Sequence, residues 1–262
     1  MLFRMPRRAA AVALAFAALG AGAPRAEPIE ATYALSQTGI TVMDVQLSID
    51  LSDDRYRVAS LSRSRGIGRF FLPREQRAEA VGGLAGRDVQ PFRYMSEGEW
   101  RGGPRRTVLE YLGGAPRLAL LEPTEDPDRI PVPPEQRDGT IDTLSALVRL
   151  ARNASATGRC DMAGAVFDGR RRVEWNSRTI GTGAPPIPGL TGEALRCRLE
   201  SRLVAGFRRG DDPAQAGRPR EADAWIAVLR AGAPPMPLRV EFPSTILGAM
   251  RLDLVRLGPS GP

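Results

Sequence analysis

The chain has 262 residues and carries 37 Lys plus Arg against 30 Asp plus Glu, a formal net charge of +7. It contains no His, and every one of its basic residues is Arg. Without an imidazole, Ser-His-Asp and Cys-His hydrolases, His-ligated zinc sites and His-ligated haem are excluded. The sequence also lacks a P-loop, a dinucleotide-binding fingerprint and a CxxC motif. We therefore expect no cofactor.

The N-terminal segment 1–26 has the plan of a secretory signal peptide. A short Arg-containing stretch precedes an uncharged, Ala-rich run over 9–23, and small residues follow it. A run of 15 residues is short for the roughly 20 that a membrane-spanning helix needs. We predict cleavage after Ala26, export to the periplasm and no transmembrane span in the mature chain. An uncleaved membrane anchor is the alternative.

The charge balance changes when this segment is removed. Residues 1–26 hold four Arg and no acid, so the mature chain would carry a net charge of +3. The remaining Arg clusters are short and interrupted by Gly, Asp or Glu. A nucleic-acid-binding domain usually shows a continuous basic patch or stripe. We therefore expect no nucleic-acid partner.

The chain contains two cysteines, Cys160 and Cys197. In an oxidising compartment two thiols in one domain are usually joined. A bond between them would close a loop of about 38 residues and contribute roughly 3–4 kcal/mol on the chain-entropy account. We predict a disulfide between them. The alternative is a pair of unbonded, buried thiols.

Past residue 26 the pattern is mostly that of β-strands. Apolar and polar residues alternate strictly from Val45 to Leu51, the period of a half-buried strand. Turn residues recur between such segments, and strands at this spacing predict a large curved antiparallel sheet of the open-barrel or half-barrel kind. The predicted strands span 29–35, 41–51, 56–61, 76–84, 91–98, 105–111, 117–121, 171–180, 194–206, 222–230, 237–242 and 246–257.

One segment, about 142–152, instead predicts an amphipathic helix. Asp142 or Thr140 can cap its start, and Gly158 follows its end. The helix must bury its apolar stripe against the sheet, either filling the concavity or covering it as a lid that borders an apolar pocket. We favour the lid, with Arg149 and Arg152 on the other face in water. The stripe, at i, i+3, i+4 and i+7, consists of Leu144, Leu147, Val148 and Ala151.

A proline-rich segment over 121–134 precedes this helix. Its five prolines exclude regular structure and predict an extended crossing or loop. The segment could divide two domains. Because the sequence is strand-rich on both sides of it, we predict one β-rich domain over 27–262.

Several short motifs lie along the chain: DTLSAL at 142–147, VFDGRRR at 166–172, GEALRC at 192–197, AWI at 224–226, PLRV at 237–240 and LG at 247–248. In their order and spacing, they resemble the bacterial domain of unknown function 3108 family. The resemblance implies an exported, mostly β protein, similar to envelope proteins with an open, curved antiparallel sheet, and it implies no catalytic residues. It also implies pairing of Cys160 with Cys197, whereas the stretch 244–248 is less regular than the family pattern.

The motif at 166–172 has two interpretations. Asp168 and Gly169 predict a two-residue hairpin turn, because Gly tolerates a positive φ. The arginines that follow, Arg170, Arg171 and Arg172, either alternate in solvent on a sheet face or form an anion site for a lipid headgroup or a partner's acidic group.

Three classes of function remain open. The first is a non-enzymatic periplasmic envelope protein that binds a lipid, another apolar ligand or an envelope partner in the concavity of the sheet. We favour this class. The second is a glycan hydrolase that uses two carboxylates, and the third is a purely structural interaction module. The acids available to a hydrolase are Glu97, Glu99, Glu122, Asp126, Asp128 and Asp142.

Overall fold

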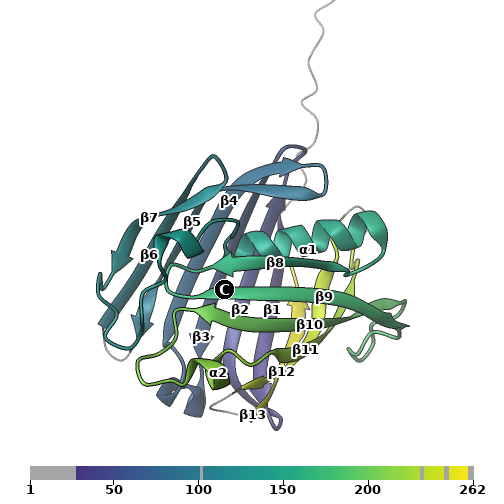
Figure 1. Ribbon diagram of the computed structural model, residues 1–262. Helices are drawn as coiled ribbons and strands as arrows, with labels where there is room; N and C mark the ends of the chain where they lie inside the picture. Colours follow the sequence, from purple (N-terminus) through teal and green to yellow (C-terminus); the bar gives the residue numbers. More distant parts are fainter. Residues whose placement is uncertain (1–27, 101–102, 231–232, 245–247, 259–262) are drawn as a thin grey trace, which may run out of the picture.

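A computed structural model describes residues 28–100, 103–230, 233–244 and 248–258 of the chain. Within these ranges thirteen strands form one sheet in the order β7-β6-β5-β4-β3-β2-β1-β13-β12-β11-β10-β9-β8 (Figure 1). Every pair of neighbouring strands is antiparallel. The sheet is open, because β7 and β8 lie at its two edges. The predicted signal peptide, 1–26, lies outside the described residues.

The prediction of a mainly β chain with one antiparallel sheet is confirmed, and β8 is the strand that the sequence pattern did not predict. The first half of the sheet consists of β1 (Ile29–Gln37), β2 (Ile40–Leu51), β3 (Arg55–Ser64), β4 (Glu75–Ala85), β5 (Asp88–Trp100), β6 (Gly103–Leu112) and β7 (Ala115–Glu122). The second half consists of β8 (Met162–Phe167), β9 (Arg172–Gly183), β10 (Ala194–Ala205), β11 (Arg220–Ala227), β12 (Met236–Ser244) and β13 (Gly248–Leu257).

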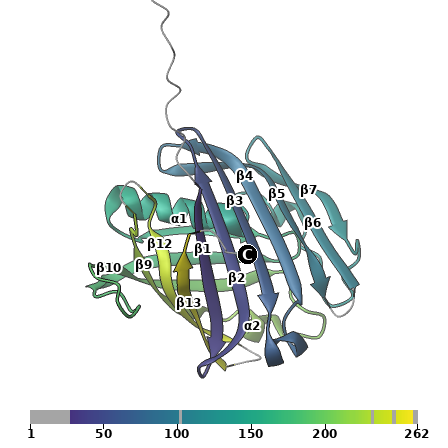
Figure 2. The same ribbon diagram turned by 180° about the vertical axis from the view of Figure 1, so that it is seen from behind.

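The sheet curves so strongly that its two halves face each other. Figures 1 and 2 show β8–β10 running across the concave side of β1–β3. Alternation along each strand sends every second side chain into the space between the halves. Ile49 and Val58 of the first half share one core cluster with Phe167 and Leu238 of the second half. The middle of the concavity is therefore filled by side chains.

Helix α1 (Thr143–Thr157) packs into this space and contacts β3, β4, β5 and β8. Asp142 caps its start by accepting the Ser145 backbone N–H at 2.8 Å, and Gly158 ends it with a φ of 65°. The helix continues past the predicted end at residue 152 and stops where Gly158 adopts the left-handed conformation. No helix among the described residues is long and apolar enough to cross a bilayer.

The predicted stripe of α1 faces the core. Val148 and Ala151 are buried, and Leu144 and Leu147 pack against the main cluster. The opposite face was expected to lie in water. Instead, the Arg149 Nε lies 2.7 Å from a carboxylate oxygen of Asp88, at the start of β5. This ion pair forms because α1 lies directly beside the β4–β5 connection.

The disulfide joins the end of this helix to the sheet. Cys160 and Cys197 are bonded, with their Cα atoms 5.9 Å apart. Both cysteines are fully buried in a small cluster with Leu150 of α1 and Ile226 of β11. Leu150, which lies outside the predicted stripe, packs in this second cluster and not in the main core.

The β8 edge of the sheet pairs with the segment that precedes α1. Ile141 runs beside β8 as a short parallel bridge, donating its N–H to Ala165 at 3.1 Å and accepting that of Phe167 at 2.9 Å. Edge strands present unpaired backbone groups to other chains, so this segment protects the β8 edge. Within the described ranges, the remaining connections contain the short elements η1 (Gly66–Phe70), η2 (Pro134–Gln136) and α2 (Pro213–Ala216).

Candidate functional site: an arginine-lined pocket at the mouth of the sheet

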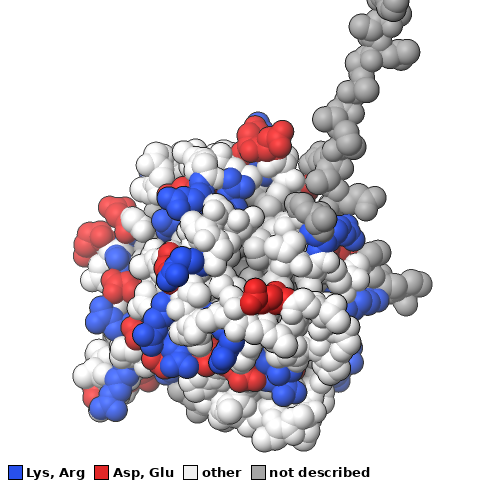
Figure 3. Space-filling model, turned by 90° about the vertical axis from the view of Figure 1, so that its right-hand side faces the viewer, with Lys and Arg blue, Asp and Glu red and all other residues white. Residues whose placement is uncertain are grey.

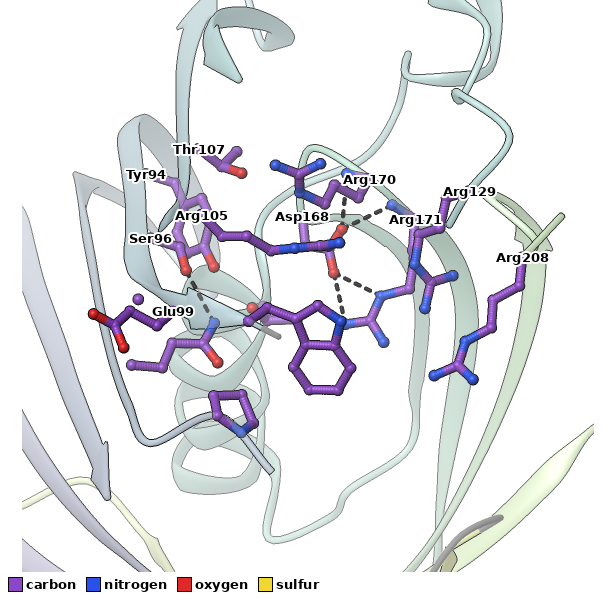
Figure 4. A pocket seen from close by; sticks show the side chains of 15 residues that line it. Tyr94, Ser96, Glu99, Arg105, Thr107, Arg129, Asp168, Arg170, Arg171 and Arg208 are labelled. Carbon is purple, nitrogen blue, oxygen red and sulfur yellow. Dashed lines mark hydrogen bonds and ion pairs between the residues drawn. The ribbon is translucent and has the colours of Figure 1, made fainter. Parts of the chain in front are cut away.

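A cavity of about 380 Å³ lies at one end of the concavity, which we call the mouth of the sheet (Figure 4). Ser96 and Thr107, from β5 and β6, lie on the same face of the sheet as the buried core residue Tyr94. They form one side of the cavity, and the β8–β9 turn lies opposite. The lining residues are Pro73, Gln76, Tyr94, Ser96, Gly98, Glu99, Trp100, Arg105, Thr107, Arg129, Thr143, Asp168, Arg170, Arg171 and Arg208. Five of them are arginines, so the cavity is strongly basic.

Two loops that are distant in sequence form part of the wall. The proline-rich loop after β7 pairs with the loop after β10 through a bridge between Arg129 and Arg208. The backbone N–H of Ile130 donates to the Phe207 carbonyl at 2.9 Å. The Arg129 side chain also donates to the Gly206 carbonyl at 2.6 Å. These bonds fix a segment that lacks helix and strand and hold Arg129 at the pocket.

The β8–β9 turn contains four residues, 168–171, rather than the two that were predicted, since Phe167 pairs with Arg172. The longer turn is stabilised by Asp168, whose carboxylate accepts the backbone N–H groups of Arg170 at 2.9 Å and Arg171 at 2.8 Å. Gly169 has a φ of 91°, and a Cβ there would lie 2.3 Å from the Thr107 methyl carbon. Glycine is therefore required by both backbone conformation and space.

Asp168 also neutralises Arg171. The two side chains form an ion pair with a shortest distance of 2.7 Å. Burial alone would raise the pKa of Asp168, but the Arg171 guanidinium and the two turn N–H groups outweigh burial and lower it. The carboxylate is therefore ionised at neutral pH and fixes the Arg171 side chain over the pocket.

Arg170 lies in a buried ion-pair network. Its side chain is 9% exposed, that of Asp126 is 7% exposed, and they lie 3.1 Å apart. Arg105 contacts both Asp126 oxygens, at 3.0 and 3.1 Å. Burial opposes ionisation of Asp126, yet the Asp128 backbone N–H and the two guanidinium groups lower its pKa. Arg170 and Arg105 thus share the single carboxylate of Asp126, and Arg105 also lies 3.8 Å from Asp128.

Arg129 and Arg208 complete the lining, and they differ from the other three arginines. Neither has a carboxylate within ion-pair distance in the part of the chain that the structure describes. Burial of Arg129, together with repulsion from Arg171 and Arg208, lowers its pKa. Their arrangement in Figure 4, with both side chains on the same wall as Arg171, concentrates positive charge there. This wall can accept an anionic group.

The structure places some of the residues predicted from sequence at the pocket and others elsewhere. Arg170 and Arg171 line the pocket, whereas Arg172 donates to the Gln136 carbonyl at 2.6 Å and is absent from the lining. None of the four apolar stripe residues of α1 lines this cavity, to which the helix contributes Thr143. The predicted anion patch thus has two of its three arginines at the pocket.

Of the acidic residues considered for a hydrolase, Asp126 and Asp128 both lie within ion-pair distance of Arg105, whereas Asp142 caps α1. Asp142 is fully buried at the start of α1, and its carboxylate accepts the Ser145 hydroxyl at 2.6 Å. That hydroxyl lies 2.6 Å from the Tyr56 hydroxyl. Burial raises the pKa of Asp142, against the hydrogen bonds from Ser145. Asp126 is held by arginines, and Glu99 lines the pocket. Among the described residues, no group of three or more Cys, Asp or Glu could hold a metal ion.

Outside the pocket, basic and acidic side chains are commonly paired across strands. Arg57 lies 3.0 Å from Glu79, and Arg239 lies 2.6 Å from Asp253. On the face shown in Figure 3, arginines and acids are interspersed. This mixing contrasts with the pocket wall, where two arginines lack such a partner.

No curated protein sequence matches the chain. A solved structure, LprF from Mycobacterium bovis, is 12% identical, with 90% of this chain and 87% of that chain covered and a TM-score of 0.28. So loose a superposition carries no argument. The family model described as "Protein of unknown function (DUF3108)" matches residues 30–255, and the chain therefore belongs to this family.

Proposed function

We propose that this chain is a non-enzymatic protein of the bacterial envelope that binds an acidic ligand, through a phosphate or carboxylate group, at the arginine-lined mouth of its sheet. The signal-like segment 1–26 supports export to the periplasm. The disulfide also supports an oxidising compartment. Sources of the acidic group include a lipid headgroup and an acidic group on an envelope partner.

The proposal is carried by Arg129 and Arg208, which lack a carboxylate partner among the described residues on the wall of a cavity. Guanidinium groups bind carboxylate and phosphate through paired, charge-assisted hydrogen bonds. Asp168 and Asp126 hold three neighbouring arginines in place, so the wall is already ordered before a ligand arrives. Pre-ordering of this kind reduces the entropy that binding costs.

The dimensions favour a headgroup over a buried acyl chain. The cavity of about 380 Å³ is at the small end of ligand sites. The middle of the concavity is occupied by core side chains such as Phe167 and Leu238. An acyl chain or polypeptide attached to the acidic group would therefore remain outside the mouth. This revises the expectation of an apolar ligand inside the sheet.

Calorimetric titration tests this proposal with inorganic phosphate, glycerol phosphate and a short-chain phosphatidylglycerol as probes. Arg129→Gln and Arg208→Gln should each weaken binding about tenfold, since a hydrogen bond to a charged group contributes roughly 1.5–3 kcal/mol. Arg178→Gln serves as the control, because Arg178 is exposed on β9 and is not part of the pocket lining.

The three probes separate the sources of the acidic group. Tighter binding of the lipid than of glycerol phosphate indicates a lipid headgroup, whereas equal binding indicates recognition of the acidic group alone. The proposal is wrong if no probe binds saturably, or if both pocket variants bind as the wild type does.

A further inference from the structure

The connection between β3 and β4 exposes a group of large apolar side chains. Phe70 is 82% exposed, Ile67 49% and Phe71 45%. All three belong to one short segment, 65–74, which contains η1. Single exposed apolar residues are common on protein surfaces, whereas a contiguous group of them is typical of a contact site.

The segment holds these side chains outward on an ordered backbone. Arg65 donates its N–H to the Val42 carbonyl at 2.8 Å, and Leu72 donates to the Gly68 carbonyl at 2.8 Å. Gly68 lies so close to β2 that a Cβ would be 2.2 Å from the Val42 carbonyl oxygen. The Leu72 side chain packs into the small cluster around Val42. The exposure of the phenylalanines is therefore part of the fold and does not result from a loose loop.

The charge of the segment identifies the kind of surface that suits it. Residues 65–74 contain Arg65, Arg69 and Arg74 and no acid. Arg65 forms an ion pair with Asp44. Arg69 and Arg74 have no carboxylate partner within the ranges that the structure describes. Apolar side chains flanked by arginines match an anionic bilayer, where the rings enter the headgroup boundary and the guanidinium groups meet phosphates.

The position of the segment agrees with this chemistry. It lies at the lower end of β3 and β4 in Figures 1 and 2, and Pro73 is part of the lining of the arginine pocket. We infer that the β3–β4 segment docks this end of the protein on an anionic phospholipid surface, with Ile67, Phe70 and Phe71 inserted. The inference uses none of the arginines that carry the pocket proposal, so either can fail without the other.

Vesicle co-sedimentation tests the inference with the protein as it is recovered from cells, its N-terminus established by intact mass and identical in all variants. The probes are phosphatidylcholine vesicles with and without phosphatidylglycerol. The wild type should sediment with the anionic vesicles, less so as salt is raised. A Phe70→Ser/Phe71→Ser variant should bind at least tenfold more weakly. Phe92→Ser is the matched control, since Phe92 is 51% exposed on β5, outside the segment.

A second variant separates the contribution of the arginines from that of the phenylalanines. Arg69→Gln/Arg74→Gln should bind several-fold more weakly and lose much of the salt dependence, because two cations near the surface are removed. Circular dichroism confirms that each variant is folded. Binding by the phenylalanine variant equal to that of the wild type overturns the inference. A wild type that stays in the supernatant with every vesicle also overturns it.

Discussion

Phe167 and Asp168 are neighbours in the chain, but they belong to two differently built regions. Phe167 ends β8 with no exposed surface and lies in the main core cluster. Asp168 begins the turn that lines the arginine pocket, in an ion pair with Arg171. In the interior, apolar side chains from both halves of the sheet pack against one another. The mouth contains more guanidinium groups than carboxylates to pair with them.

The difference indicates which parts of the concave side serve stability and which can bind. In the interior each side chain contributes through close packing, so any loss of volume destabilises the fold. At the mouth, Arg170 and Asp126 are also structural. Arg208 has no such structural role, because its side chain forms no ion pair with a carboxylate among the described residues. Substitutions in the interior should therefore mainly lower stability, whereas substitution of Arg208 at the mouth should mainly weaken ligand binding.

The largest expected effect is in the interior. Phe167→Ala should lower the free energy of unfolding by about 3–5 kcal/mol, the usual cost of removing a buried aromatic side chain. It also removes the ring over which the Arg137 guanidinium lies, 5.6 Å from the centroid. Urea denaturation measures the change, with Phe92→Ala as an exposed control. A loss of unfolding free energy below 1 kcal/mol would contradict the close packing of side chains in the middle of the concavity.

A smaller effect is expected at Asp142, which lies between the two regions. Burial raises its pKa, so the folded state holds this proton more tightly than the unfolded chain, whose Asp has a pKa of about 3.9. Stability should consequently fall as the pH rises from about 4 through the folded-state pKa. Asp142→Asn retains a good helix cap and should flatten this dependence. Melting temperatures between pH 4 and 7 provide the measurement, and parallel curves for the two proteins would refute the assignment.

The smallest expected change in stability is at the mouth. Arg208→Gln should alter the free energy of unfolding by less than about 0.5 kcal/mol, as for exposed residues without special contacts. Arg170→Gln is the comparison, because it leaves a buried carboxylate with one fewer partner and should cost about 1–3 kcal/mol. Both values come from the same denaturation experiment. Equal losses would show that Arg208 is structural and would weaken its role in binding.

Local patterns predicted most of the fold. Alternation placed strands such as 41–51 close to their observed bounds, and the spacing of Leu144, Leu147 and Val148 predicted the buried face of α1. β8 was not predicted, because its sequence, MAGAVF, contains small residues and little alternation.

The pocket could be predicted only in part. Arg170 and Arg171 were found because they are adjacent in sequence. Arg129 and Arg208 are 79 residues apart in number and meet through a bridge between two irregular loops, which no local pattern reveals. Which arginines have carboxylate partners is likewise a property of the folded chain.

The strand order has a consequence for how the molecule assembles. β1 and β13, the first and last strands of the described residues, pair at the centre of the sheet, with Ser36 opposite Arg251. Each half is a meander of neighbouring strands whose contacts are local, and local contacts form quickly. The central pair has to close the longest loop in the chain, so it should join two preformed meanders late in folding. The proline-rich loop between β7 and α1 is where a circular permutant could begin. With β13 linked directly to β1, all thirteen strands would then follow one another in order.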